Sequence, residues 1–235
     1  MNKELIEKIK SRGYWRITFQ PLIYKEEKLK LGECLDIVQK NKVSLRGWDY
    51  PFVTERTGDD VGLTPCNNFY EGWVSWSSFN EYWRMYQSGQ FLHYLGLNED
   101  WKEEDSWGNE KEIKPGEIIG ITGSITYHIT EVFEFLSRLA INGIYDDGVL
   151  VSISLNNTKS RKLKVMDPMR MDFLSDYKAG DDIKYEKKYT KDELITKPKD
   201  LAFDVIIYIC ERFGWHKPSV DVIKKDQEDL FLRRF

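Results

Sequence analysis

Charged and aromatic side chains alternate in the middle of the chain in a way that suits the binding of a protein partner or a small anionic ligand. An arginine can hold a carboxylate or phosphate through two parallel hydrogen bonds, and a neighbouring tryptophan supplies a stacking face. Gly47 leaves room for the close approach of a ligand or another backbone. The alternative interpretation is an internal clamp between Arg46 and Asp49 at a strand end. The candidate ligand-binding residues are Arg46, Trp48, Asp49, Trp83, Arg84 and His93.

These candidates lie in a wider segment, residues 44–107, that is rich in aromatic side chains. Large aromatic side chains contribute most to stability when they are buried, and buried charges need partners. The segment is therefore either an aromatic core or a binding cleft. Trp73, Trp76 and Trp101 within it could form a stacking platform for bases or sugars. Tryptophans of this kind are also common in cores and partner interfaces.

Two weaker patterns suggest a phosphodiesterase or nuclease as an alternative. Glu112 and Lys114 match the acidic-x-lysine pair of many metal-dependent nucleases, in which carboxylates hold Mg²⁺ and the lysine orients water. Arg84 and His93 could instead act as phosphate stabiliser and acid–base group, although they are nine positions apart. Either version requires the groups to converge on one accessible site.

Nucleic-acid binding without cleavage is a further alternative. Basic residues from Lys159 to Lys164 sit on and beside the tip of a predicted hairpin and could contact phosphates; the alternative is a solvated hairpin. The net charge of −4 argues against a protein that coats nucleic acid. His128, with Glu131 one turn further on, is a weak acid–base candidate near a predicted helix start.

Standard cofactor and catalytic motifs are missing from the sequence. It contains no GxGxxG, P-loop, HExxH or GxSxG pattern, and its three histidines lack metal-ligand spacing. We therefore expect no cofactor and no metal. The first hypothesis is a non-enzymatic binding module that uses the aromatic, arginine-containing cleft.

Composition points to a soluble protein of the cytoplasm. The chain has 235 residues, of which 41% are hydrophobic and 14% aromatic, enough for a sizeable core. Three separated cysteines fit a reducing compartment. The N-terminus does not resemble a signal peptide, and the apolar runs are too short to cross a membrane. Abundant tryptophan also makes a homo-oligomer possible.

Hydrophobic periodicity predicts the elements that would position these residues. Amphipathic spacing predicts helices near residues 5–12, 32–40, 78–86, 126–142 and 219–231, and a helical stretch from Thr190 that Pro198 restarts as a second helix to residue 213. Alternation and turn residues predict strands at 14–21, 42–45, 91–95 and 117–122, and a hairpin from 149–155 and 161–165. Residues 57–68, 99–115 and 167–191 are predicted loops.

Interspersed strands and helices favour an α+β fold, with an antiparallel or mixed sheet covered by helices. We expect one compact domain over residues 1–235. A subdivision into a sheet-containing part, 1–188, and C-terminal helices, 189–235, is possible.

Four segments, taken in order, resemble a family of bacterial stand-alone proteins to which no activity is assigned. They are Arg12–Arg16, Leu45–Pro51, Trp83–Phe91 and Glu131–Phe135, with the patterns RGYWR, LRGWDYP, WRxYQSGQF and EVFEF. The resemblance would cover nearly the whole chain, which implies one integral unit. It implies no cofactor, substrate or catalytic residue.

Overall fold

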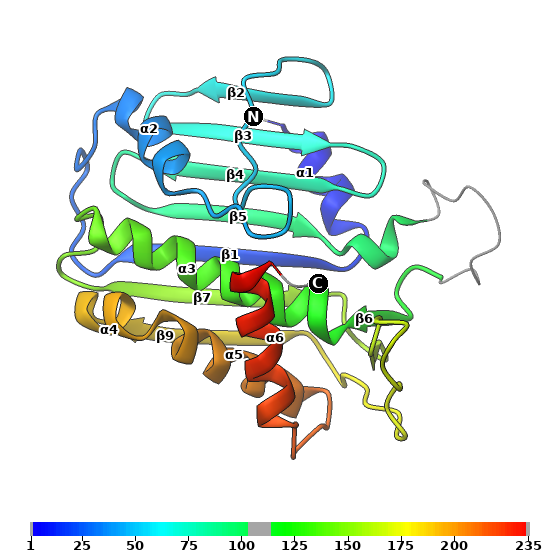
Figure 1. Cartoon of the computed structure of the whole chain (residues 1–235). Coiled ribbons are helices and arrows are strands. Elements are labelled where there is room, and N and C mark those ends of the chain that lie inside the picture. The colour runs from blue at the N-terminus through cyan, green and yellow to red at the C-terminus, as the bar shows by residue number, and fades with distance from the viewer. Residues whose placement is uncertain (1, 103–113, 234–235) are drawn as a thin grey trace.

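One antiparallel sheet organises the molecule. A computed structural model describes residues 2–102 and 114–233, and within them seven strands pair in the order β2-β3-β4-β5-β1-β7-β9 (Figure 1). The adjacent strands β1 and β7 alternate buried and more exposed positions, as strands of a sheet with two different faces do. The strands are β1 (Tyr14–Pro21), β2 (Val61–Pro65), β3 (Phe69–Ser75), β4 (Asn80–Tyr86), β5 (Phe91–Gly96), β7 (Val149–Asn156) and β9 (Ile183–Tyr189).

Helices cover both faces of this sheet unequally. The long helix α3 (His128–Ile141) lies in front of the sheet with α2 (Leu31–Asn41), α4 (Lys191–Thr196), α5 (Pro198–Arg212) and α6 (Val220–Leu232), whereas α1 (Lys3–Lys10) lies behind it (Figure 1). The main core fills the front layer, and Leu5 and Ile9 of α1 form a separate small cluster with Tyr82. A sheet with both faces partly covered needs apolar residues on both sides of its central strands.

Short elements connect the sheet to α3. A 3₁₀ turn, η1 (Asn98–Asp100), follows β5, and a π-helical segment, η3 (Ile121–Tyr127), leads directly into α3. Beside them, β6 (Ile118–Gly120) and β8 (Lys162–Lys164) pair in parallel as a separate small sheet. π-Helical turns are rare and often occur at functional sites.

The predicted α+β class is confirmed, as are most of the predicted helices and strands. Thr190 begins α4 with a capping box, and Pro198 begins α5 at its first turn, as the sequence indicates. All three cysteines are free. No helix in the described parts of the chain is both long enough and apolar enough to cross a bilayer.

The helix predicted over residues 78–86 is wrong, because this segment is strand β4. Its aromatic residues fit a helical period, but they also favour strands, where they pack across neighbouring chains. Glu81 resembles a capping-box residue, yet its carboxylate accepts a hydrogen bond from the backbone N–H of Phe52 and contacts His93. Gly72 of β3 faces Trp83 across the ladder and leaves space for its indole ring.

Four other predictions are corrected by the pairing of strands. β7 and β8 do not form a hairpin, because β7 pairs with β1 and β9 while β8 pairs with β6. The predicted loops at 57–68 and 167–191 contain the edge strands β2 and β9. Residues 42–45 form only an isolated bridge between Val43 and Tyr50. Edge strands carry fewer buried residues, so their sequence signal is weak.

Candidate functional site

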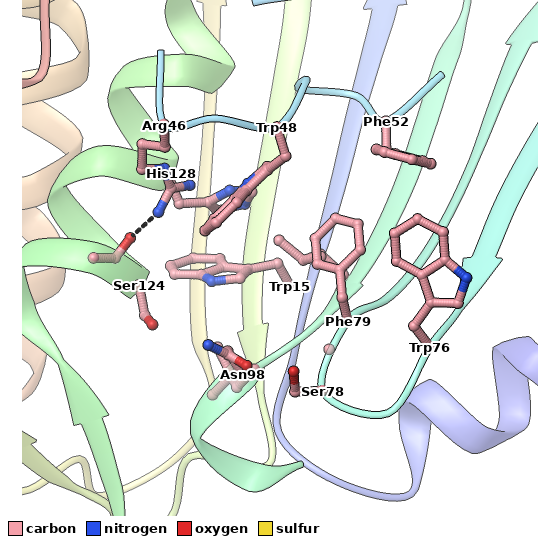
Figure 2. A pocket seen from close by; sticks show the side chains of 14 residues that line it. Trp15, Arg46, Trp48, Phe52, Trp76, Ser78, Phe79, Asn98, Ser124 and His128 are labelled. Carbon is pink, nitrogen blue, oxygen red and sulfur yellow. Dashed lines mark hydrogen bonds between the residues drawn. The ribbon is translucent and has the colours of Figure 1, made fainter. Parts of the chain in front are cut away.

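A cavity of about 380 Å³ opens at the end of the sheet where η1 and the start of α3 meet (Figure 2). Four parts of the chain line it besides β1: the loop before β2, the turn between β3 and β4, the segment from β5 into η1, and η3 with the first residue of α3. Its volume is in the range typical of small-molecule sites. The cavity is therefore large enough to take a ring system with substituents.

Five tryptophan and phenylalanine side chains line the cavity. Trp15 of β1 is buried, whereas Trp48 of the loop before β2 is 44% exposed. Figure 2 shows the Trp48 indole above that of Trp15, with Phe79 and Trp76 beside them. The rings brace each other, with centroids 6.2 Å apart for Trp48 and Phe79 and 5.3 Å for Phe52 and Trp76. Such a wall favours ligands with flat apolar faces.

Two contacts fix the loop to its neighbours, and a backbone pair braces it internally. The indole N–H of Trp83 donates to the carbonyl oxygen of Phe52 at 2.8 Å. Val43 and Tyr50 exchange backbone hydrogen bonds of 2.8 Å. Arg46 reaches α3, where its Nε donates to Glu131 Oε1 at 3.0 Å and its Nη2 donates to Glu131 Oε2 at 2.5 Å. The loop is thus fixed to both β4 and α3.

The Arg46–Glu131 pair determines the charge of the cavity wall. Glu131 is completely buried, and the side chain of Arg46 is 14% exposed. Arg46 Nη1 also donates to the carbonyl oxygen of Gly123 at 2.9 Å. Burial raises the pKa of Glu131, and the arginine opposes that shift. One charge therefore compensates the other, and little net positive charge faces the cavity.

His128 is the most unusual residue of the site. It is 2% exposed, and neither ring nitrogen has a hydrogen-bond partner. Its ring packs between Trp15 and Tyr50, each with its centroid 5.4 Å from that of the imidazole. Burial, His93 and Arg46 hold the pKa of His128 well below its usual range. The neutral imidazole therefore has an unused donor and an unused acceptor, and both nitrogens lie buried just beneath the cavity wall.

A buried ion pair positions η1 at the cavity edge. Asp100 and Arg161 are each 1% exposed in their side chains and make two parallel contacts of 2.7 Å. Asp100 also accepts hydrogen bonds from the backbone N–H groups of Gly13 and Gly116. The preceding residue, Glu99, accepts from the Ser124 hydroxyl and from the N–H of Gly120. These bonds join η1, β1 and η3 around the cavity.

The structure separates the six residues predicted to bind a ligand. Arg46 and Trp48 lie together on the cavity wall, with the guanidinium carbon 5.1 Å from the indole centroid. Asp49 does not pair with Arg46; it accepts a hydrogen bond from Ser44 and forms an ion pair of 2.7 Å with Lys42. The internal Arg46–Asp49 clamp is therefore wrong.

The other three predicted residues lie outside the cavity wall. Trp83 and His93 are opposite each other on β4 and β5, fully buried, and His93 Nε2 lies 2.9 Å from Glu81 Oε1. Arg84 follows Trp83 and so faces the other side of the sheet, where it pairs with Glu71 at 3.2 Å. Arg84 and His93 therefore do not converge on one site.

The remaining candidates fall in several places. Glu112 lies outside the described residues. In the basic segment, Lys162 pairs with Asp176 and Lys164 with Asp172, so acidic partners offset these charges. Trp76 lines the cavity, but Trp101 is buried beside Gly96 and Trp73 packs near α1. The three tryptophans do not share one surface.

Sequence reasoning missed several of the residues that line the cavity. Trp15 has the pattern of an ordinary strand residue, and nothing near Asn98 or Ser124 has a motif. Phe52 and Phe79 belong to the aromatic segment at residues 44–107. The composition of that segment indicates a core or a cleft, but it does not indicate which side chains face a cavity. The position of His128 at a predicted helix start marks it as a candidate. Its lack of hydrogen-bond partners depends on tertiary contacts, which the sequence does not show.

Comparison with known proteins identifies no relative of this chain. The chain matches no protein-family profile, no curated protein and no solved structure. The resemblance to a bacterial family therefore stays a prediction, and the cavity is the feature from which a function can be inferred.

Proposed function

We propose that this protein is a binding module that holds a small molecule in the aromatic cavity beside Arg46 and His128. The observation that carries the proposal is the His128 imidazole, which is buried at the cavity with both nitrogens unpartnered. A buried polar group without a hydrogen bond costs free energy, about 1–3 kcal/mol. A bound ligand that forms this bond would recover that cost.

Binding is better supported than catalysis by the same geometry. A histidine that acts as a base is normally oriented by a second group and lies within reach of a nucleophile. His128 has no orienting partner within the described residues, and the nearby Ser124 hydroxyl donates to Glu99 at 2.6 Å. The site thus offers recognition groups without an assembled proton relay.

A fragment screen by ligand-observed NMR tests the proposal on the full-length protein. We expect fragments of mixed chemistry to bind the natural protein, and Trp48→Ala to weaken those hits at least tenfold. Trp48 is 44% exposed, so its removal should leave the fold intact. Trp215→Ala is the matched control, because Trp215 packs on Phe173 and Tyr177 and does not line the cavity.

Two results would contradict the proposal. One is a screen without any hit on the natural protein. The other is a set of hits that survive Trp48→Ala unchanged, since such fragments bind elsewhere. Circular dichroism of both variants checks that each one is folded.

A further inference from the structure

We infer that the ligand is an uncharged, planar nitrogen heterocycle of the nucleobase type, stacked against Trp48 and hydrogen-bonded by His128. This inference rests on the proposed binding function and specifies its ligand class. It follows from three properties of the cavity wall: its charge, its shape and its unused hydrogen-bonding groups.

Charge is the first property. Among the described residues that line the cavity, Arg46 alone carries a charge, and Glu131 compensates it through two hydrogen bonds. An anion would have to compete with a carboxylate that is completely buried and cannot move into water. An organic cation would lie close to the guanidinium. A neutral ligand neither competes with Glu131 nor is repelled by the guanidinium of Arg46.

Shape is the second property. Trp48 keeps 44% of its surface exposed, although it is braced by Phe79 on one side and by the Arg46 guanidinium on another. Figure 2 shows it extending over Trp15 from the loop above. An exposed indole that is held by two neighbours over a second indole presents a stacking surface. Base–aromatic stacking of this kind contributes about 1–3 kcal/mol per ring.

Hydrogen bonding is the third property. A neutral imidazole carries one donor and one acceptor, and both are unused in His128. Asn98 at the cavity edge adds an exposed amide, which pairs well with an adjacent donor and acceptor on a base. A hydrocarbon ring would stack but leave His128 unpaired. A nitrogen heterocycle satisfies both the stacking wall and the imidazole.

Isothermal titration calorimetry with a defined set of probes tests the inference. The probes are adenosine, guanosine, cytidine and uridine, with adenosine monophosphate, choline, methyl glucoside and toluene for comparison. We expect at least one nucleoside to bind at least tenfold tighter than choline, the glucoside and toluene. If adenosine is that nucleoside, adenosine monophosphate should bind less than threefold tighter than adenosine.

Variants then separate the hydrogen bond from the stacking. His128→Leu should weaken the best nucleoside at least tenfold and change toluene binding less than threefold. The matched control is His216→Leu, because His216 is an exposed histidine away from the cavity lining. Equal nucleoside binding by natural protein and His128→Leu would contradict the role of the imidazole.

The outcomes distinguish this inference from the proposed function. If fragments bind at the cavity but no nucleoside does, the ligand class is wrong and the binding module stands. Tightest binding of choline or the glucoside leads to the same conclusion. A tenfold gain from the phosphate shows recognition of an anion and also overturns the inference. If no compound of any class binds, both proposals fall.

Discussion

The unpartnered nitrogens of His128 should lower the free energy of unfolding, and a substitution can measure this effect. Leucine has a similar volume and no polar atom, so His128→Leu removes two unsatisfied buried nitrogens. We expect the free energy of unfolding at pH 7, from urea titration, to rise by about 1 kcal/mol. A loss of more than about 1 kcal/mol would show that the imidazole has a hidden partner. Increased stability with lost binding would mark a residue kept for function.

The same residue predicts how stability depends on pH. The folded-state pKa of His128 is lowered by burial, whereas the unfolded chain has its ordinary value near 6.5. Below pH 6.5 the unfolded state binds a proton that the folded state does not, so stability falls as pH falls. The advantage of His128→Leu over natural protein should therefore grow below pH 6.5, by up to about 1.4 kcal/mol per pH unit. A difference that does not change between pH 7 and pH 5 would contradict the assignment.

Arg46 is predicted to be essential for stability as well as for the site. Arg46→Ala leaves Glu131 buried without its counter-charge, which should cost about 3–5 kcal/mol in a urea titration at pH 7. The double variant Arg46→Met with Glu131→Leu removes both charges and should recover most of that loss. A cost below about 1 kcal/mol for Arg46→Ala would show that water reaches Glu131.

For single residues, the sequence predicts which side chains belong to the site better than it predicts which side chains they contact. Arg46 and Trp48 were found as neighbours, since they are two positions apart on one short loop. Glu131 was not found as the partner of Arg46, because the pair spans 85 positions and depends on how the loop crosses α3. Long-range pairing leaves no periodic trace in one sequence.

Among the elements, β4 shows why local patterns mislead. Phe79, Tyr82, Trp83 and Tyr86 have the spacing of one helix face, but neighbouring strands on both sides fix the segment as a strand. α1 covers the second face, so apolar residues occur on both sides and the alternation typical of strands is lost. By contrast, α3 and α5 follow a clear helical period because each has one wide apolar face.

The element η1 is predicted to depend on its ion pair with Arg161. Arg161→Met leaves Asp100 buried without a counter-charge, so we expect a loss of about 3–5 kcal/mol of unfolding free energy. Lys162→Met is the matched control, because its pair with Asp176 is exposed and should contribute under about 1 kcal/mol. Thermal and urea unfolding would measure both. Equal effects of the two variants would contradict a structural role for the buried pair.

One hydrophobic cluster joins the sheet to the C-terminal helices. Buried residues of the C-terminal helices, among them Leu194, Val205 and Ile223, belong to the same hydrophobic cluster as Trp15 of β1. α3 contacts α4 and α5. Each part therefore buries apolar surface of the other.

This shared core predicts a single unfolding transition. Seven of the eight tryptophans precede residue 188, so fluorescence reports on the sheet-containing part. Far-UV circular dichroism also reports on the helices α4, α5 and α6, which begin at Lys191. Because one core joins the two parts, both signals should change at the same urea concentration and with the same slope. Loss of the helical signal at lower urea than the fluorescence change would show that residues 189–235 unfold independently, and the subdivision would then be real.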